Sequence, residues 1–62
     1  MPIVKIDLWE GSTVEEKDQL IRSVTDAVVK SIGVDPQHVF VLLNEVHKDN
    51  WGIGGKKASH KR

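Results

Sequence analysis

Pro2 is the residue of this chain with the clearest capacity for chemistry. The chain begins Met1-Pro2, and a small second residue permits removal of the initiator methionine, which would expose the secondary amine of Pro2. An ordinary α-amino group has a pKa of about 7.7–8.0, and apolar surroundings disfavour its protonated form. Such an amine suits general-base catalysis near neutral pH. The alternative is that Pro2 only starts a strand, where its missing N–H does no harm.

Other kinds of reactive or metal-binding site find little support in the sequence. The chain contains no cysteine, which excludes disulfides within it, thiolate metal sites and thiol nucleophiles. The three histidines, His38, His47 and His60, have spacings that match no metal motif. We therefore expect no metal site.

Two strands and a helix between them must position Pro2. Residues 3–9 alternate in polarity, and the cleaner apolar face consists of Val4, Ile6 and Leu8. Residues 38–46 are β-branched and aliphatic, as is typical of a central strand. One face of this second strand carries Val39, Val41 and Leu43, and the other carries Phe40, Leu42 and Asn44.

The intervening segment predicts a helix of about 20 residues that begins near Thr13. Thr13 with Glu16 fits a capping box, and Ser12 with Glu15 fits one a residue earlier. Gly33 supplies a C-terminal cap, and the Pro36 that follows prevents continuation. Three- and four-residue spacing predicts an apolar stripe formed by Leu20, Val24, Ala27, Val28 and Ile32.

These elements predict the α/β class, with one β-α-β domain over residues 1–62 and a parallel, right-handed strand pair. The glycine-rich segment from Lys48 onward predicts a loop and a short C-terminal ribbon. A chain this short buries only about 60% of its extended-chain surface. One helix covers one face of a two-stranded sheet, so we expect sibling chains to cover the other.

Charge and hydropathy favour a soluble, cytoplasmic protein. The nine basic and nine acidic side chains cancel, but the last 13 residues carry four basic residues and no acidic one. Such a basic tail can attract a neighbouring subunit or an anion, or remain solvated. No apolar run approaches the ~20 residues of a membrane span, and the N-terminus lacks the features of a signal peptide.

Several segments together resemble the 4-oxalocrotonate tautomerase family, from Pro2 to the last residues and without an insertion. Three features together are specific for this family, although each alone is weak: the length, the proline after Met1 and the aromatic-Gly-Ile-Gly-Gly segment. The residues that carry the resemblance are Pro2-Ile3-Val4-Lys5-Ile6, Glu10-Gly11, Glu16-Lys17, Leu20-Ile21, Val24-Thr25, Lys30-Ser31, Asn44-Glu45, Trp51-Gly52-Ile53-Gly54-Gly55 and Ala58-Ser59.

The resemblance implies an isomerase whose β-α-β subunits pair into a four-stranded sheet and assemble as a hexamer of three dimers. It implies that Pro2 takes a proton from an enol hydroxyl and returns one to carbon, with no cofactor. Typical substrates would be small unsaturated keto or enol acids, such as the 2-hydroxydienoates of aromatic catabolism. Trp51 would be the aromatic wall of the pocket.

The chain departs from the family pattern at the carboxylate-binding positions. Ser12 and Phe40 stand where the family's tautomerases have arginines, so two bidentate carboxylate clamps are missing. His38 lies near the pocket by resemblance and could replace part of the charge, although a surface histidine at a strand end is the more common outcome. Trp9 would be a pocket wall or a dimer contact. Arg62 matches the family's terminal arginine and could offer an anion contact.

Three hypotheses follow. A homohexameric tautomerase would use Pro2 on a monocarboxylate such as an aryl enolpyruvate. Alternatively, some segments also resemble the arginine-poor chain of the heterohexameric trans-3-chloroacrylic acid dehalogenases, in which case a partner chain would supply the cations. These segments are Gln19-Leu20-Ile21-Arg22, Lys30-Ser31-Ile32-Gly33, Asp35-Pro36, Val41-Leu42-Leu43 and Glu45. A non-catalytic module could instead touch a nucleic-acid backbone through Trp51 and Lys56-Lys57, but the near-neutral charge disfavours it. We expect no nucleic-acid or membrane partner.

Overall fold

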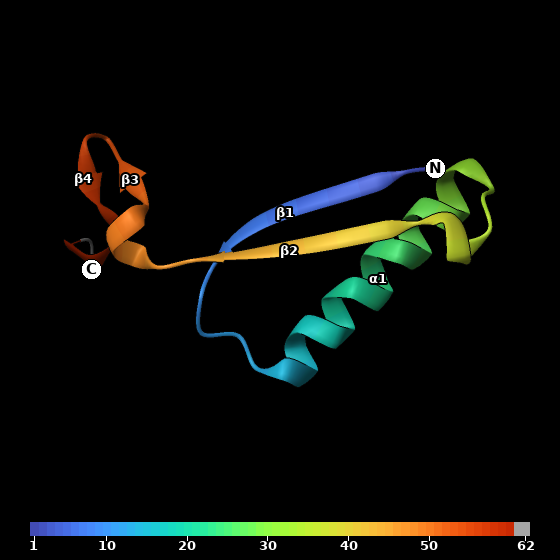
Figure 1. Cartoon of the computed structure of the whole chain (residues 1–62), viewed down its shortest axis with the longest axis horizontal. Helices are drawn as coiled ribbons and strands as arrows, with labels where there is room; N and C mark the ends of the chain where they lie inside the picture. Colours follow the sequence, from blue (N-terminus) through green and yellow to red (C-terminus); the bar gives the residue numbers. More distant parts are fainter. Residues whose placement is uncertain (61–62) are drawn as a thin grey trace.

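The alternation of residues 3–9 produces the strand that the sequence predicts, and this strand pairs with a second one after a helical crossover (Figure 1). The computed structural model describes residues 1–60. Its main elements are β1 (Ile3–Trp9), α1 (Val14–Ile32), β2 (Phe40–Val46), β3 (Gly52–Ile53) and β4 (Lys56–Lys57). Three single-turn 3₁₀ helices are η1 (Pro36–His38), η2 (Lys48–Asn50) and η3 (Ala58–His60).

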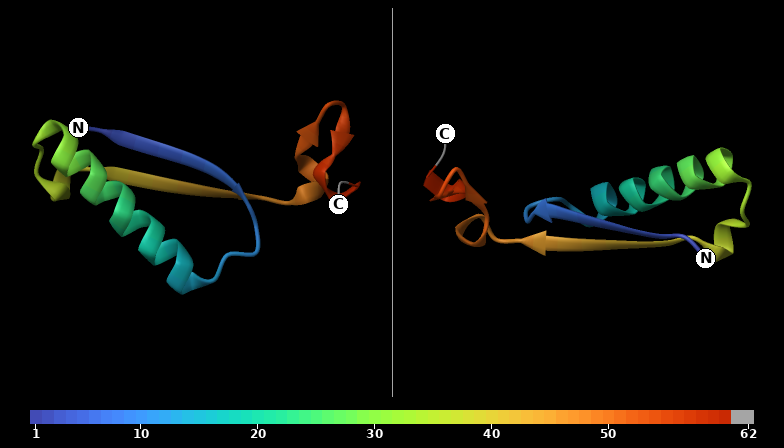
Figure 2. Two further views of the ribbon diagram at one scale, coloured as in Figure 1. Left: turned by 180° about the vertical axis from the view of Figure 1, so that it is seen from behind. Right: turned by 90° about the horizontal axis from the view of Figure 1, so that it is seen from above.

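Strands β1 and β2 are parallel, with Ile3 opposite Phe40 and Trp9 opposite Val46. The face of the sheet that α1 covers carries the half-buried side chains Val4, Ile6, Leu8, Val41 and Leu43. This is the face that the alternation predicts to be the more apolar. Helix α1 lies on this face only, as the edge-on view of Figure 2 shows.

The ends of α1 are set by the capping residues that the sequence indicates. The Thr13 side chain accepts a hydrogen bond from the Glu16 N–H at 3.0 Å, and the Glu16 carboxylate accepts one from the Thr13 N–H at 2.9 Å. Of the two capping boxes that the sequence allows, the helix therefore uses the later one. Gly33 ends the helix at φ 70°, a left-handed conformation that glycine adopts without a Cβ penalty.

The buried stripe of α1 is narrower than predicted. Leu20, Val24 and Val28 are half-buried, whereas Ala27 and Ile32 are exposed. A two-stranded sheet is too narrow to cover the whole apolar arc of the helix. Near the start of α1, Lys17 also connects the helix to the sheet through an ion pair with Glu45 of β2, at 2.9 Å.

The second strand begins two residues later than predicted, because His38 lies in η1 and not in the strand. The Asp35 side chain accepts a hydrogen bond from the Gln37 N–H at 2.9 Å, and Pro36 fills the first position of the turn. An aspartate followed by proline favours such a turn over extended backbone.

The C-terminal segment forms a small unit beyond the end of the sheet, at the orange and red end of Figure 1. Strands β3 and β4 pair antiparallel and form the short ribbon that the sequence predicts, with Gly54 and Gly55 in its turn. The Ala58 N–H donates to the Trp51 carbonyl oxygen at 2.7 Å. This bond ties η3 to the start of the hairpin, and Ala58 is buried there.

The isolated chain has almost no closed core. Among residues 1–60, Ala58 alone is buried. The radius of gyration is 14.5 Å, whereas a compact domain of this length would have about 10.5 Å. The uncovered face of the sheet presents Ile3, Trp9, Phe40 and Leu42 at 40–56% exposure. Exposed apolar side chains gathered on one sheet face are typical of an interface between chains.

The described part of the chain lacks two further features. No helix within it is long and apolar enough to cross a membrane. No group of three or more histidine, aspartate or glutamate side chains within residues 1–60 is placed to hold a metal ion.

Candidate functional site

Pro2 lies at the start of β1, where the second strand also begins. The backbone N–H of Phe40 donates to the Pro2 carbonyl oxygen at 3.0 Å, and Ile3 pairs with Phe40 in the strand register. Pro2 is half-buried, and the side chains of its apolar neighbours, Ile3 and Phe40, lie on the uncovered face of the sheet. The hydrogen bond thus fixes the backbone of Pro2 at the end of the sheet, next to Ile3 and Phe40.

His38 lies at this same end of the sheet, two residues before Phe40. It closes η1, and its backbone N–H donates to the Asp35 carbonyl oxygen at 2.9 Å. The side chain is exposed. The structure therefore groups Pro2, His38 and Phe40 at one end of the sheet.

Trp9 and Trp51 meet at the opposite end. Their ring centroids are 5.8 Å apart and their planes make an angle of 79°, an edge-to-face arrangement. Such pairs contribute about 0.5–1.5 kcal/mol beyond the area that they bury. Lys48 Nζ lies over the Trp9 ring, 4.7 Å from its centroid. A cation–π contact at an exposed site is worth about 0.5–1 kcal/mol.

The two groups of candidate residues are far apart within one chain. Pro2 and Trp9 are separated by seven residues of strand, which at 3.3 Å per residue is about 23 Å. Figure 1 shows the amino terminus and the C-terminal hairpin at opposite ends of the molecule. A pocket that contains both Pro2 and Trp51 therefore requires ends contributed by two chains.

Two candidate substrate-binding residues remain, Ser12 and Arg62. Ser12 is half-buried in the turn between β1 and α1, just before the capping Thr13. It lies near the Trp9 end of the strand and not near its own Pro2. Arg62 lies outside the described residues.

One titration in the C-terminal unit is perturbed. The Ser59 hydroxyl donates to Asp49 Oδ1 at 2.6 Å, and this hydrogen bond is the main cause that lowers the pKa of Asp49. The positive charges of Lys57, His47 and His60 act in the same direction, and burial opposes them. His47 also connects this unit to the sheet, because its Nε2 lies 3.7 Å from a Glu10 carboxylate oxygen.

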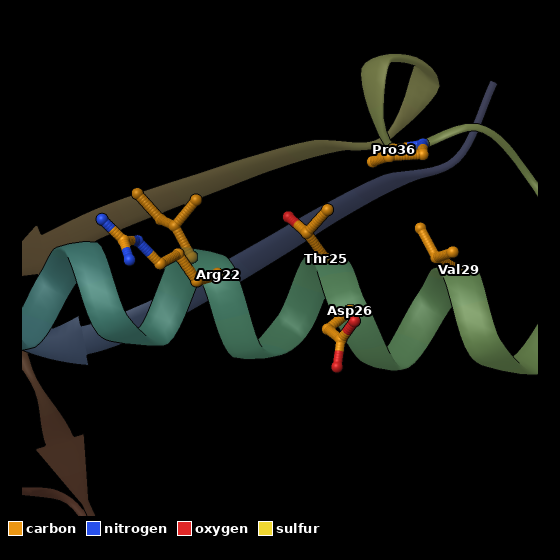
Figure 3. A pocket seen from close by; sticks show the side chains of 6 residues that line it. Arg22, Thr25, Asp26, Val29 and Pro36 are labelled. Carbon is orange, nitrogen blue, oxygen red and sulfur yellow. The ribbon is translucent and has the colours of Figure 1, made fainter.

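A groove of about 300 Å³ lies elsewhere, along α1 near η1 (Figure 3). Its lining consists of Ile21, Arg22, Thr25, Asp26, Val29 and Pro36. None of the candidate catalytic or substrate-binding residues belongs to this set. The groove is thus separate from the proposed chemistry.

Lys48 is the residue that sequence reasoning missed at the Trp9 end. It is 39 residues from Trp9 along the chain, so no local spacing connects the two. A predicted strand register would have revealed it, because Trp9 pairs with Val46 and Lys48 follows two residues later.

The chain is similar to known tautomerases over its whole length. The family model described as "Tautomerase enzyme" matches residues 2–61. A 2-hydroxymuconate tautomerase of Pseudomonas sp. (strain CF600) is 42% identical over 62 residues, covering 100% of this chain and 98% of that protein.

Solved structures agree with this similarity. A 4-oxalocrotonate tautomerase isozyme from Methylibium petroleiphilum is 41% identical, with a TM-score of 0.89 over 94% of each chain. A heterohexamer 4-oxalocrotonate tautomerase from Chloroflexus aurantiacus is 27% identical, with a TM-score of 0.93 over 100% of each chain. The resemblance deduced from the sequence and the β-α-β fold are thereby confirmed. This chain belongs to the tautomerase family of isomerases.

Proposed function

We propose that this chain is a cofactor-independent enol–keto tautomerase in which Pro2, exposed by removal of Met1, is the general base. The observation that carries the proposal is the position of Pro2, half-buried at the sheet end with its carbonyl oxygen bonded to the Phe40 N–H. This bond uses the carbonyl group of Pro2 and not its nitrogen, so the ring nitrogen would be free to act as a base once Met1 is removed. The family membership supplies the reaction class.

In the proposed reaction, the neutral Pro2 nitrogen accepts the proton of the substrate's enol hydroxyl. The O–H electron pair forms the new C=O bond, the carbon–carbon double bonds shift, and the distal carbon takes a proton back from the prolinium. The proline ends in its starting form, so the cycle needs no redox partner. In an assembly that buries Ile3 and Phe40 around the amine, these apolar side chains would favour its neutral form between turnovers.

The active form would be a hexamer of three dimers, each dimer with a four-stranded sheet. Three observations support assembly: the near absence of a core, the exposed apolar sheet face and the distance between Pro2 and Trp51. The pocket would lie where the Pro2 end of one chain meets the Trp9 and Trp51 end of another. Trp51 would then form its aromatic wall.

The substrate would be a 2-hydroxydienoate or, better suited to this pocket, an aryl enolpyruvate. Ser12 and Phe40 replace the two family arginines, so fixed positive charge is scarce, and a monocarboxylate needs less of it. Developing negative charge on the substrate still needs a donor. His38 at the Pro2 end and Arg62 are the candidates for this role from the sequence.

A second candidate function is that of an arginine-lacking subunit in a heterohexamer. The similarity to the Chloroflexus heterohexamer protein and the missing arginines favour it. In that assembly a second chain would supply the carboxylate-binding arginines, and Pro2 of this chain would be structural or auxiliary.

The experiment that tests the proposal is ketonisation of phenylenolpyruvate by the purified chain, with loss of Met1 verified by mass spectrometry. We expect Pro2→Ala to lower kcat/KM by about 100-fold or more. Ser31→Ala, at an exposed position of α1, is the control and should leave the rate unchanged. Activity should also fall as the pH drops through the pKa of the proline amine, because the protonated form is no base.

Each result separates the candidates. An unchanged rate in Pro2→Ala would remove Pro2 as the base. A correctly processed, assembled wild-type chain with no rate would favour the heterohexamer. Restoration of activity by an arginine-bearing partner chain would then establish it.

A further inference from the structure

One cluster at the end of the sheet consists of Trp9, Trp51 and Lys48. Backbone pairing, a backbone hydrogen bond and a contact between the two rings hold its tryptophans in place. Trp9 ends β1, where its backbone pairs with Val46. The carbonyl group of Trp51 is held by the Ala58 N–H at 2.7 Å, next to the buried Ala58. The two indoles meet edge to face at 5.8 Å. The two indole rings therefore have a fixed arrangement in the absence of a ligand.

The Lys48 ammonium lies on an aromatic face and not on a carboxylate. Lys17, Arg22 and Lys30 each form an ion pair of 2.9–3.1 Å, whereas no carboxylate of residues 1–60 lies within 4.0 Å of Lys48 Nζ. An ammonium group has three N–H donors, and contact with the ring face leaves donors for an anion. Lys48 therefore retains a charge that a ligand can use.

We propose that this cluster is a substrate subsite that binds the carboxylate of a planar, conjugated monoacid. Lys48 Nζ pairs with the carboxylate, and the indoles of Trp9 and Trp51 contact the flat apolar part of the molecule. This inference rests on the proposed function, because it names the substrate class and a further binding residue for that reaction. The cluster serves the Pro2 of a neighbouring chain, since its own Pro2 is about 23 Å away.

The charges around the cluster select one carboxylate and not two. Glu10 follows Trp9 and Asp49 follows Lys48, and both carboxylates approach His47 at 3.7 Å. Asp49 also accepts the Ser59 hydroxyl at 2.6 Å, so it is engaged away from Lys48. Glu10 and Asp49 would repel a second carboxylate of the ligand placed beside them.

The test measures binding of unreactive probes to the assembled full chain by quenching of tryptophan fluorescence. Cinnamate is a planar conjugated monoacid, cinnamamide is its uncharged analogue and trans,trans-muconate is a dicarboxylate. We expect cinnamate to bind at least tenfold more tightly than the other two. K48Q should remove the preference for cinnamate over cinnamamide, while K48R keeps it.

Lys56→Gln is the matched control, because Lys56 is a β4 lysine outside the cluster, and it should leave all three affinities unchanged. Size-exclusion chromatography verifies assembly, and K48M replaces K48Q if the latter does not assemble. Equal loss of cinnamate and cinnamamide binding, or no loss of either, would overturn the subsite.

Kinetics separate this inference from the proposed function. If the subsite is correct, K48Q raises the KM for phenylenolpyruvate at least tenfold, with a smaller effect on kcat. A wild-type chain that binds cinnamate through Lys48 but does not ketonise phenylenolpyruvate would sink only the proposed function. A chain that depends on Pro2 for activity, with a KM indifferent to Lys48, would sink only the subsite.

Discussion

The backbone N–H of Phe40 donates to the carbonyl oxygen of Pro2 at 3.0 Å. This bond sets the register of the parallel pair, and the register decides what stands at each end of the sheet. Pro2 and Phe40 share one end, and Trp9 with Val46 closes the other. A one-residue slip would turn the apolar set of β2 away from α1, so packing against the helix secures the same alignment.

Phe40 lies beside Pro2 and stands where the resemblance places one of the two family arginines. A substitution at Phe40 therefore tests whether this position binds a carboxylate. We expect Phe40→Arg to raise kcat/KM for a dicarboxylate enol such as 2-hydroxymuconate by about tenfold or more, because a guanidinium can bind a carboxylate in bidentate fashion. Steady-state kinetics on this substrate and on phenylenolpyruvate measure the change. Phe40→Leu is the control, since it removes the ring without adding charge. If Phe40→Arg shows no gain, the position is not a carboxylate clamp.

The uncovered sheet face is expected to hold the chains together. Leu42 lies in its middle and is 49% exposed in the single chain. Leu42→Asp should reduce the assembly to smaller species, because a charge buried without a partner is costly. Sedimentation velocity measures the mass. Val14→Asp is the matched control, because Val14 is 75% exposed at the start of α1, where an acidic residue is favourable. An intact hexamer in Leu42→Asp would place the interface elsewhere.

The start of α1 depends on the capping box. Thr13→Ala removes the side-chain acceptor for the Glu16 N–H and should lower the free energy of unfolding by about 1 kcal/mol. Urea denaturation at a fixed protein concentration measures this change, because assembly makes stability concentration-dependent. Ser31→Ala, at an exposed helical position, is the control. In the double variant with Glu16→Ala, the two losses should not add, since both residues belong to one motif.

The C-terminal unit should weaken in acid. The pKa of Asp49 is lowered chiefly by the Ser59 hydroxyl, so its stabilising effect is present above the ordinary aspartate pKa of about 3.9 and is lost as the pH falls through the lowered value. Ser59→Ala should move the pKa of Asp49 upward toward that ordinary value. Carbon-detected NMR titration of the carboxyl group measures it. An unmoved pKa would mean that the nearby positive charges, and not the hydroxyl, dominate.

Local patterns were sufficient for most of the fold. The alternation of residues 3–9, the Thr13 and Glu16 capping pair and Gly33 act over a few residues, so they are readable without knowledge of distant contacts. The predicted strand start and helix stripe were wrong where another interaction outweighed the local pattern. Asp35-Pro36 diverted His38 into a turn, and the narrow sheet left Ala27 and Ile32 uncovered.

The sequence by itself determined the family, the order of strand, helix and strand, and Pro2 as the candidate base, since each depends on residue type and short-range spacing. Tertiary structure alone decided that Pro2 and Trp51 lie at opposite ends of the sheet and that Lys48 lies over Trp9. The physical reason is the parallel register. Hydrogen bonds between the strands pair residues that are 37 positions apart, and the extended backbone of β1 keeps its two ends a full strand length from each other.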